Sequence, residues 1–282
     1  MATIENQQEK ISQFHQLHHS GKLLVLPNIW DPLGATLLES LGYPAVATAS
    51  AAVAWSNGYN DGEKIPFDFL LNILRRIVSS VNVPVTADIE SGYAENDEQL
   101  KQNIGQLIET GVVGINIEDS DKKTNALLPT EIQCKKIELI KQVAEQTKGA
   151  MFVNARTDVY TRGNLYATPE AKLEETINRG LAYRAAGADC FFPLAMRDKD
   201  EIIKTVKQVQ MPVNIIAIPG IPDLEALQEI GVARVSLGPG FLKIAIRAMK
   251  NLAARLQSLD GLADITNNEI TSEFMKTLLN KE

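Results

Sequence analysis

The chain has 282 residues, enough for one large α/β barrel or two ordinary domains, and 45% hydrophobic with 22% charged residues is typical of a globular protein with a large core. A formal net charge of −7 gives no electrostatic footprint for nucleic acid or for an anionic membrane surface, so we expect neither as a partner. An anionic substrate would need local positive charge, from an arginine or a bound cation.

Cysteine usage and the absence of targeting segments predict a cytoplasmic protein. The two cysteines, Cys134 and Cys190, lie far apart in the sequence, which favours a reducing compartment over a disulfide framework. No Cys and His pair has the spacing of a zinc site. We see no signal peptide at the N-terminus and no run of about 18 apolar residues that would span a membrane.

The first twenty residues predict a helix with one apolar side, formed by Ile11, Phe14, Leu17 and His18. His15 and His19 stand four residues apart, a spacing that a metal site on a helix would allow. No carboxylate accompanies them, so we interpret this segment as a surface or lightly packed helix.

From residue 23 the chain repeats one pattern: a short apolar run, a polar or glycine-containing loop, and a helical stretch. We expect strands at 23–28, 45–50, 83–90, 112–119, 150–157, 188–194, 213–219 and 233–239. We expect helices at 33–41, 67–81, 98–110, 130–147, 169–186, from about 199, at 223–230 and at 242–256, with a long loop from strand two through Asp61. Eight such units predict a (β/α)8 TIM barrel. A doubly wound open sheet is the alternative, disfavoured by the count and by the absence of GxGxxG after the first strand.

We therefore expect one barrel domain over residues 1–282: an N-terminal helix at 1–20, the barrel at 23–256 and a C-terminal helical extension at 260–282. Within the extension, residues 262–279 predict one further amphipathic helix, which would cap the barrel or pack on another subunit.

Chemistry in such a barrel sits at the C-terminal ends of the strands. The stretch PVTADIESGY (84–93) ends a buried strand in two acids, Asp88 and Glu90, which alternation places on one side. Two like charges there are costly unless a cation lies between them or they face a wet rim. Asp61 and Glu118 are expected nearby, and Arg156 faces them from the fifth strand.

This all-oxygen set of acids favours Mg2+, or Mn2+, over zinc, with Asp88 as the best direct ligand and Glu90, Glu118 and Asp61 acting through water. Arg156 is available to bind a substrate carboxylate bidentately. Strand ends lack a lysine for Schiff-base chemistry and a histidine for general-base chemistry. Acids at strand ends also cap helices or solvate loops, and this is the alternative interpretation of Asp31, Asp119 and Asp158. Gly238 and Gly240 would line a phosphate site or only a turn.

The chain also resembles the isocitrate lyase/phosphoenolpyruvate mutase superfamily, over roughly residues 23–240. Six motifs in order carry the resemblance: PNIWD (27–31), ATASAA (47–52), GYNDG (58–62), ADIESGY (87–93), NIED (116–119) and NARTD (154–158). The resemblance implies a Mg2+-dependent enzyme acting on small 2-oxo acids, and a homo-oligomer, dimer or tetramer, with swapped C-terminal helices. It implies Asp88 as metal ligand, Glu90 in place of a second Asp, Glu118 and Asp61 as water-mediated carboxylates, and Thr48, Ser50, Ala51, Asn154 and Arg156 at the substrate.

Two departures from the superfamily pattern narrow the reaction. The loop SDKKTNALLPTE (120–131) has Thr124 where the lyase branch has its catalytic Cys, which favours the phosphoenolpyruvate mutase-like branch. Lys123 and Asn125 then resemble residues of a gating loop that closes over the substrate. Pro193 stands where the phosphonate-processing branch places a His, which disfavours phosphoryl transfer.

We therefore predict cleavage of a C–C or P–C bond through a metal-stabilised pyruvate enolate, as in oxaloacetate decarboxylation or phosphonopyruvate cleavage. The alternatives are a 2-methylisocitrate lyase-like enzyme, a catalytically inactive barrel that binds metal and a 2-oxo acid, and a phosphosugar-type barrel that uses Gly238 and Gly240.

Overall fold

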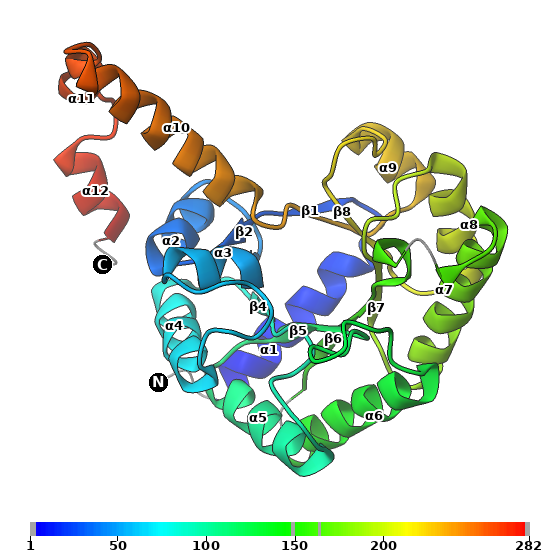
Figure 1. The fold of residues 1–282 in the computed structure, drawn as a ribbon. Helices are drawn as coiled ribbons and strands as arrows, with labels where there is room; N and C mark the ends of the chain where they lie inside the picture. Colours follow the sequence, from blue (N-terminus) through cyan, green and yellow to red (C-terminus); the bar gives the residue numbers. More distant parts are fainter. Residues whose placement is uncertain (1–3, 148–149, 163–164, 280–282) are drawn as a thin grey trace.

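The computed structural model describes residues 4–147, 150–162 and 165–279, and in it α-helices surround a ring of parallel strands (Figure 1). This confirms the predicted α/β class. The strands are β1 (Leu24–Leu26), β2 (Asn28–Ile29), β3 (Val46–Thr48), β4 (Val85–Asp88), β5 (Gly114–Glu118), β6 (Phe152–Thr157), β7 (Cys190–Pro193), β8 (Asn214–Ile216) and β9 (Arg234–Ser236).

Hydrogen bonds group the strands into two sheets, β2-β3-β4-β5-β6-β7 and β1-β9-β8. The two sheets meet each other at both of their edges. β1 and β2 are consecutive pieces of one segment, interrupted at Pro27, which has no N–H to give to a ladder. On the other side Phe191 of β7 pairs in parallel with Val213, just before β8. The ring therefore closes, and each of the eight predicted strand segments lies in it, as in a TIM barrel.

Residues 1–3 of the predicted N-terminal helix lie outside the described residues, and the eight helices predicted for the barrel match their observed counterparts to within two residues. The observed helices are α1 (Ile4–His18), α2 (Pro32–Ser40), α3 (Ser50–Ser56), α4 (Phe67–Ser80), α5 (Asp97–Glu109), α6 (Thr130–Gln146), α7 (Pro169–Ala185), α8 (Lys199–Val209), α9 (Leu224–Ile230), α10 (Gly240–Gln257), α11 (Leu262–Thr266) and α12 (Ser272–Leu279), with a short 3-10 helix, η1 (Val159–Thr161). Asp31 caps α2, since its Oδ1 accepts from the Gly34 N–H at 2.7 Å. The capping interpretation of Asp31 therefore holds.

Two segments differ from the prediction. The expected loop after strand two contains α3, because its run SAAVAW is rich in alanine, the strongest helix former. The single helix expected over 262–279 is two helices. Asn268 accepts from the Ile270 N–H at 2.8 Å and Thr271 from the Phe274 N–H at 3.1 Å, so side chains compete for the backbone between them.

The barrel interior is sealed at one end by α1, which crosses the middle of the ring in Figure 1. Phe14 and Ile11 of α1 pack on inward-facing side chains that include Leu24 and Phe152. Phe152 begins β6, so α1 covers the N-terminal ends of the strands. Ligands therefore have access from the opposite end, where β4, β5 and β6 finish in polar residues.

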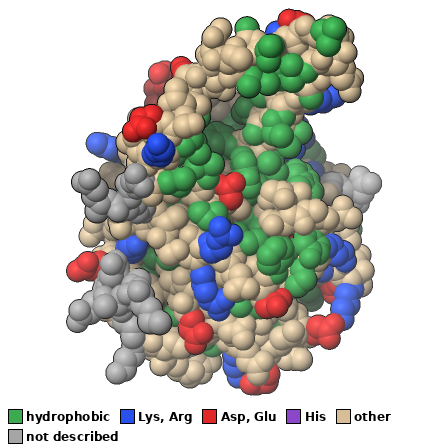
Figure 2. All heavy atoms as spheres, turned by 90° about the vertical axis from the view of Figure 1, so that its left-hand side faces the viewer, with side chains coloured by type: hydrophobic (Ala, Val, Ile, Leu, Met, Phe, Trp, Pro, Cys, Tyr) green, Lys and Arg blue, Asp and Glu red, His purple; other side chains and the backbone are tan. Residues whose placement is uncertain are grey.

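At the chain's C-terminal end, α10 leaves the ring as an arm, and α11 and α12 turn back toward α2 (Figure 1). α12 packs on α2 of its own chain, and Leu278 is buried there. Large apolar side chains remain exposed along the arm, where Figure 2 shows them gathered with those of the face beneath it. Among the described helices, none has the length and apolar character needed to cross a bilayer.

Candidate active site

Neighbouring strand ends bring the predicted acids and Arg156 together. Asp88 ends β4, Glu118 lies near the end of β5, and Arg156 stands opposite Glu118 in the β5–β6 register. The Arg156 Nη1 atom lies 2.7 Å from Glu118 Oε2. Glu118 is buried and the Arg156 side chain is 17% exposed, so the pair is a largely buried ion pair at the open end of the ring; we call the cluster of charged and polar residues around it the pocket.

Asp88 is held by hydroxyl and amide groups. Its Oδ2 accepts from the Ser50 hydroxyl at 3.1 Å, and its Oδ1 accepts from the Glu90 N–H at 3.2 Å. The Asp88 N–H donates to Thr48 Oγ1 at 3.1 Å, which fixes the strand end. Among the described residues Asp88 has no salt-bridge partner, so its carboxylate is available to bind a cation.

Lys122 is a member of this cluster that the sequence did not single out. Its Nζ lies 2.7 Å from Glu90 Oε2 and 2.6 Å from Glu118 Oε1, so one ammonium bridges both glutamates. Burial works against this charge, but the two glutamates outweigh it and raise the pKa of Lys122. The sequence argument singled out its loop neighbour Lys123 instead; the available signal was the spacing of four residues between Glu118 and Lys122.

Glu90 sits in a strained, buried position. Its φ of 53° lies in the left-handed region, which a non-glycine side chain seldom adopts, and its side chain is 3% exposed. Burial raises the pKa of Glu90 to about 7, against the opposing effects of Lys122 and of the Glu63 N–H, which donates to Oε1 at 2.8 Å. Glu63 in turn accepts from the N–H groups of Ser91 and Tyr93. Glu63 and Glu90 thus connect the loop that contains Asp61 to the end of β4 by hydrogen bonds.

Arg156 is oriented by a second carboxylate. Asp158 accepts from its Nε at 2.6 Å and from its Nη2 at 2.9 Å, a bidentate pair, and also from the Ser120 hydroxyl at 2.8 Å. Burial lowers the pKa of Arg156, but Glu118 and Asp158 outweigh it and raise that pKa. Asp158 is therefore a positioning group rather than a helix cap.

Asp119, the residue after Glu118, has a structural role. It is fully buried and accepts from Thr157, Tyr183 and the Asp158 N–H at 2.6, 2.7 and 2.9 Å. These bonds tie the ends of β5 and β6 to α7.

The remaining predicted residues divide into two groups. Thr48, Ala51 and Asn154 are buried around the pocket, and Asn154 donates to Asn116 Oδ1 at 2.8 Å. Asp61 is exposed on its loop, near enough to affect the titration of Glu90.

Lys123 and Asn125 do not join the cluster. Both are exposed, and Lys123 pairs with Glu95 at 2.8 Å. Their action on a substrate stays a prediction, and it requires the loop to move.

The donor set suits Mg2+ in its chemistry, since Asp88, Glu90 and Glu118 offer carboxylate oxygens from adjacent strand ends. In the conformation described, no three acidic, His or Cys side chains of the described residues converge on one point. Lys122 occupies the space between two of them. Mg2+ takes only one or two direct carboxylates and keeps several waters, so Asp88 alone meets its minimum requirement.

The backbone N–H groups of Gly238 and Gly240 already donate hydrogen bonds within the protein. The Gly238 N–H donates to Asn28 Oδ1 at 2.9 Å, and the Gly240 N–H donates to the Leu237 carbonyl at 3.1 Å. A phosphate would have to displace these bonds, so the phosphosugar alternative loses its site.

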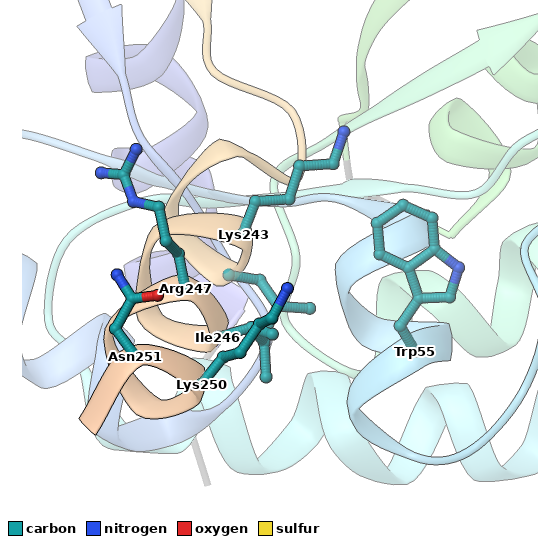
Figure 3. Close-up of a pocket in the computed structure, with 7 residues that line it drawn as sticks. Trp55, Lys243, Ile246, Arg247, Lys250 and Asn251 are labelled. Carbon is teal, nitrogen blue, oxygen red and sulfur yellow. The ribbon is translucent and has the colours of Figure 1, made fainter. Parts of the chain in front are cut away.

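A separate hollow of about 410 Å3 lies between α3 and α10 (Figure 3). Trp55 forms one side, and Lys243, Ile246, Arg247 and Lys250 of α10 form the other. The Lys243 ammonium lies 5.7 Å from the centre of the Trp55 ring, a cation–π distance. This hollow is at the root of the arm and belongs to the exposed face rather than to the pocket inside the ring.

Comparison with known proteins gives one matching family: the phosphoenolpyruvate phosphomutase family, over residues 14–257. An uncharacterized protein of Mycobacterium tuberculosis is 37% identical over 227 residues, which are 80% of this chain and 81% of that protein. Oxaloacetate decarboxylase 1 of Pseudomonas fluorescens is 26% identical over 93% of this chain and 90% of its own. The phosphonopyruvate hydrolase of Variovorax sp. is 27% identical over 87% and 86%.

Solved structures agree with the fold. A candidate phosphonomutase from Burkholderia cenocepacia superposes with a TM-score of 0.83 at 36% identity, covering 90% of this chain and 100% of that one. A phosphonopyruvate hydrolase in complex with oxalate and Mg2+ superposes with a TM-score of 0.83 at 23% identity, covering 95% and 94%. At that identity the second likeness bears on the fold alone.

Proposed function

The chain belongs to the phosphoenolpyruvate mutase/isocitrate lyase superfamily, and from that membership we propose that it is a Mg2+-dependent enzyme that cleaves a C–C or P–C bond of a small 2-oxo acid. The observation that carries the proposal is that Asp88, Glu118 and Arg156 lie at the ends of three neighbouring strands, β4, β5 and β6. Asp158 holds the guanidinium in plane at 2.6 and 2.9 Å, at the open end of the ring. A fixed guanidinium next to an acid without a cationic partner suits a carboxylate substrate bound together with a cation.

The residues of the pocket divide the chemical work. Arg156 binds the substrate carboxylate. The N–H groups of Ser50 and Ala51 lie in the first turn of α3, where that of Ser50 donates to Asp88 Oδ2 at 3.5 Å; with substrate bound they would donate to the oxygen on which enolate charge develops. Mg2+, held by Asp88 with Glu90, Glu118 and Asp61 in support, would supply Lewis-acid stabilisation of that same charge. Thr48 and Asn154 shape the floor beneath it.

Decarboxylation makes the smallest demand on these residues. The bond from C3 to the carboxylate breaks, its electron pair becomes the enolate, CO2 leaves as a neutral molecule, and water returns a proton to C3. No general base is needed, and the exposed Thr124 stands where the lyase branch has its catalytic Cys. P–C cleavage of a phosphonopyruvate-type substrate uses the same enolate but needs an acceptor for the phosphoryl group. A 2-methylisocitrate lyase-like reaction would need a base where Thr124 lies.

The test is a Mg2+-dependent activity screen with oxaloacetate, phosphonopyruvate and 2-methylisocitrate, run for wild type, Asp88→Ala and a matched control. Asp223→Ala is the control, because Asp223 caps α9 by accepting from the Ala226 N–H and is far from the acids of β4 and β5. We expect Asp88→Ala to lose activity by about 10^3-fold or more, the scale of removing a group on which charge stabilisation depends. Binding of a 2-oxo acid without turnover of any would favour the inactive-barrel alternative instead.

We further propose that the arm mediates homo-oligomer formation, as a dimer or tetramer. Ile244, Ile246 and Met249 of α10 are more than half exposed, at 54%, 53% and 66%. Such an apolar helix face is unusual on a monomer and is typical of an interface. We expect Ile246→Glu to yield monomers in light scattering, whereas an unchanged molar mass would place the interface elsewhere.

A further inference from the structure

The four carboxylate oxygens of the two glutamates bridged by Lys122 each have a partner. Glu90 Oε1 accepts from the Glu63 N–H at 2.8 Å, and Glu118 Oε2 pairs with Arg156 at 2.7 Å. Lys122 holds the other two oxygens, Glu90 Oε2 and Glu118 Oε1, at 2.7 and 2.6 Å. A cation that binds either glutamate through the oxygen that faces Lys122 meets the ammonium already bound there.

From this geometry we propose that Lys122 and the divalent cation are alternative occupants of the Glu90–Glu118 pair, so that binding of the cation expels Lys122 and releases the loop that carries it. The inference rests on the proposed function, because it takes the metal dependence proposed there as given. The new element is that Lys122 of this chain competes with the cation for the same two carboxylate oxygens. Two positive charges at this spacing in a buried site repel strongly, which makes joint occupancy unfavourable.

Lys122 is the residue through which this loop contacts Glu90 and Glu118. Between Ser120, which donates to Asp158, and Leu128, whose N–H donates to the Asp119 carbonyl, the chain forms a tight turn. Residues 123–126 of this turn are exposed. Asp121 closes the turn on itself by accepting from the N–H groups of Lys123 and Thr124. Withdrawal of Lys122 therefore frees the turn without breaking a strand.

A cavity beside the turn gives Lys122 a place to go. Its volume is about 480 Å3, and Lys122 lines it together with four acids, Glu63, Glu95, Asp97 and Asp121, and two lysines, Lys123 and Lys136. Glu95 and Asp97 already pair with Lys123 and Lys135, so a displaced ammonium would share these carboxylates rather than face an apolar wall. Lys122 thus has two polar positions, one between the glutamates and one in this cavity.

The test measures Mn2+ binding by electron paramagnetic resonance in the absence of substrate, for wild type, Lys122→Met and Lys123→Met. Methionine removes the charge of Lys122 and keeps an unbranched chain of similar length. We expect Lys122→Met to bind Mn2+ about tenfold more tightly or better, because a like charge and a competitor are both gone. Lys123→Met, in which an exposed partner of Glu95 is lost, should stay within about twofold of wild type.

A second measurement uses the wild-type protein and does not depend on the folding of a variant. The amide of Asp121 donates to the Ala126 carbonyl and that of Asn125 to the Asp121 carbonyl, both within the turn. We expect Mn2+ to speed hydrogen exchange of these amides and to leave those of α6 unchanged.

Equal or weaker Mn2+ binding by Lys122→Met, or slower exchange in the turn, would overturn the inference. Neither result bears on turnover. Conversely, a chain that shows the affinity shift but converts none of the acids screened would keep the inference and lose the proposed function. If neither wild type nor Lys122→Met binds Mn2+, the inference and the proposed function both fail.

Discussion

Two arginines inside the same barrel have opposite surroundings. Arg156, at the open end of β6, contacts Glu118 and Asp158. Arg234, on β9, is fully buried, and its Nε donates to Ser236 Oγ at 3.1 Å. Its two terminal nitrogens have no hydrogen-bond partner among the described residues, and neither does Asn214 Nδ2 on the adjacent strand.

Their titration follows from these surroundings. Glu118 and Asp158 raise the pKa of Arg156 in spite of burial, whereas burial lowers the pKa of Arg234 to about 10. Both side chains are still cations at neutral pH. The comparison teaches that carboxylates compensate the charge at the open end and hold it in place, while charge in the interior is a net cost that the fold carries.

The largest expected effect is at the compensated arginine. Arg156→Met leaves Asp158 and one oxygen of Glu118 buried without their cation, so we expect the free energy of unfolding to fall by about 3–5 kcal/mol. If the proposed function is correct, kcat/KM for the substrate falls as well, by about 10^3-fold. Urea unfolding and steady-state kinetics measure the two effects.

Arg156→Lys is the control for this prediction, since it keeps the charge but loses the bidentate pair with Asp158. We expect it to recover much of the stability and little of the activity. Full activity in Arg156→Lys would show that the guanidinium geometry is not what the substrate needs.

The interior arginine should respond in the opposite direction. Arg234→Met replaces a buried cation that lacks a carboxylate partner in the described part of the chain with an apolar side chain of similar length. We expect the free energy of unfolding to stay the same or rise by about 1–4 kcal/mol, with kcat unchanged. A loss of stability of similar size would mean that ordered water or an anion compensates Arg234.

Much of the fold was predictable because its signals are local. Continuous apolar runs mark strands buried on both faces, and glycines after the helices mark their ends. The break between α11 and α12 was missed because Asn268 and Thr271 act through side-chain bonds to the backbone, which periodicity does not report.

The site was predictable only where strands position it. Asp88, Glu118 and Arg156 were found because alternation and strand order place them at one end of the ring. Lys122 was missed because its contact with the two glutamates depends on how the loop after β5 folds back on the pocket. The sequence pointed to its neighbour Lys123 instead. The bond from Asp158 to Arg156 was also out of reach, since it depends on the turn after β6.

The smallest predicted effect separates the two ends of the barrel by the sign of their pH dependence. His18 of α1 is buried below Arg234, and its Nδ1 donates to the Phe14 carbonyl at 2.8 Å. Burial, aided by Arg234, lowers the pKa of His18 from 6.5 to about 3. Its contribution to stability is therefore complete above pH 6.5 and is lost as the pH falls toward 3. Between pH 7 and pH 5 the loss is about 2 kcal/mol.

Glu90, at the open end, has the opposite sign, because burial raises its pKa from 4.5 to about 7 and its contribution is lost as the pH rises through 7. Because it removes the contribution that rises with pH, His18→Leu should lose about 2 kcal/mol of unfolding free energy relative to wild type as the pH is raised from 5 to 7. His15→Gln, at a half-exposed position on the same helix, should run parallel to wild type. Because Arg234 contributes to the shift of His18, Arg234→Met should change the pH dependence in the same direction and by less; if neither His18→Leu nor Arg234→Met differs from wild type in pH dependence, the acid sensitivity does not arise from the barrel interior.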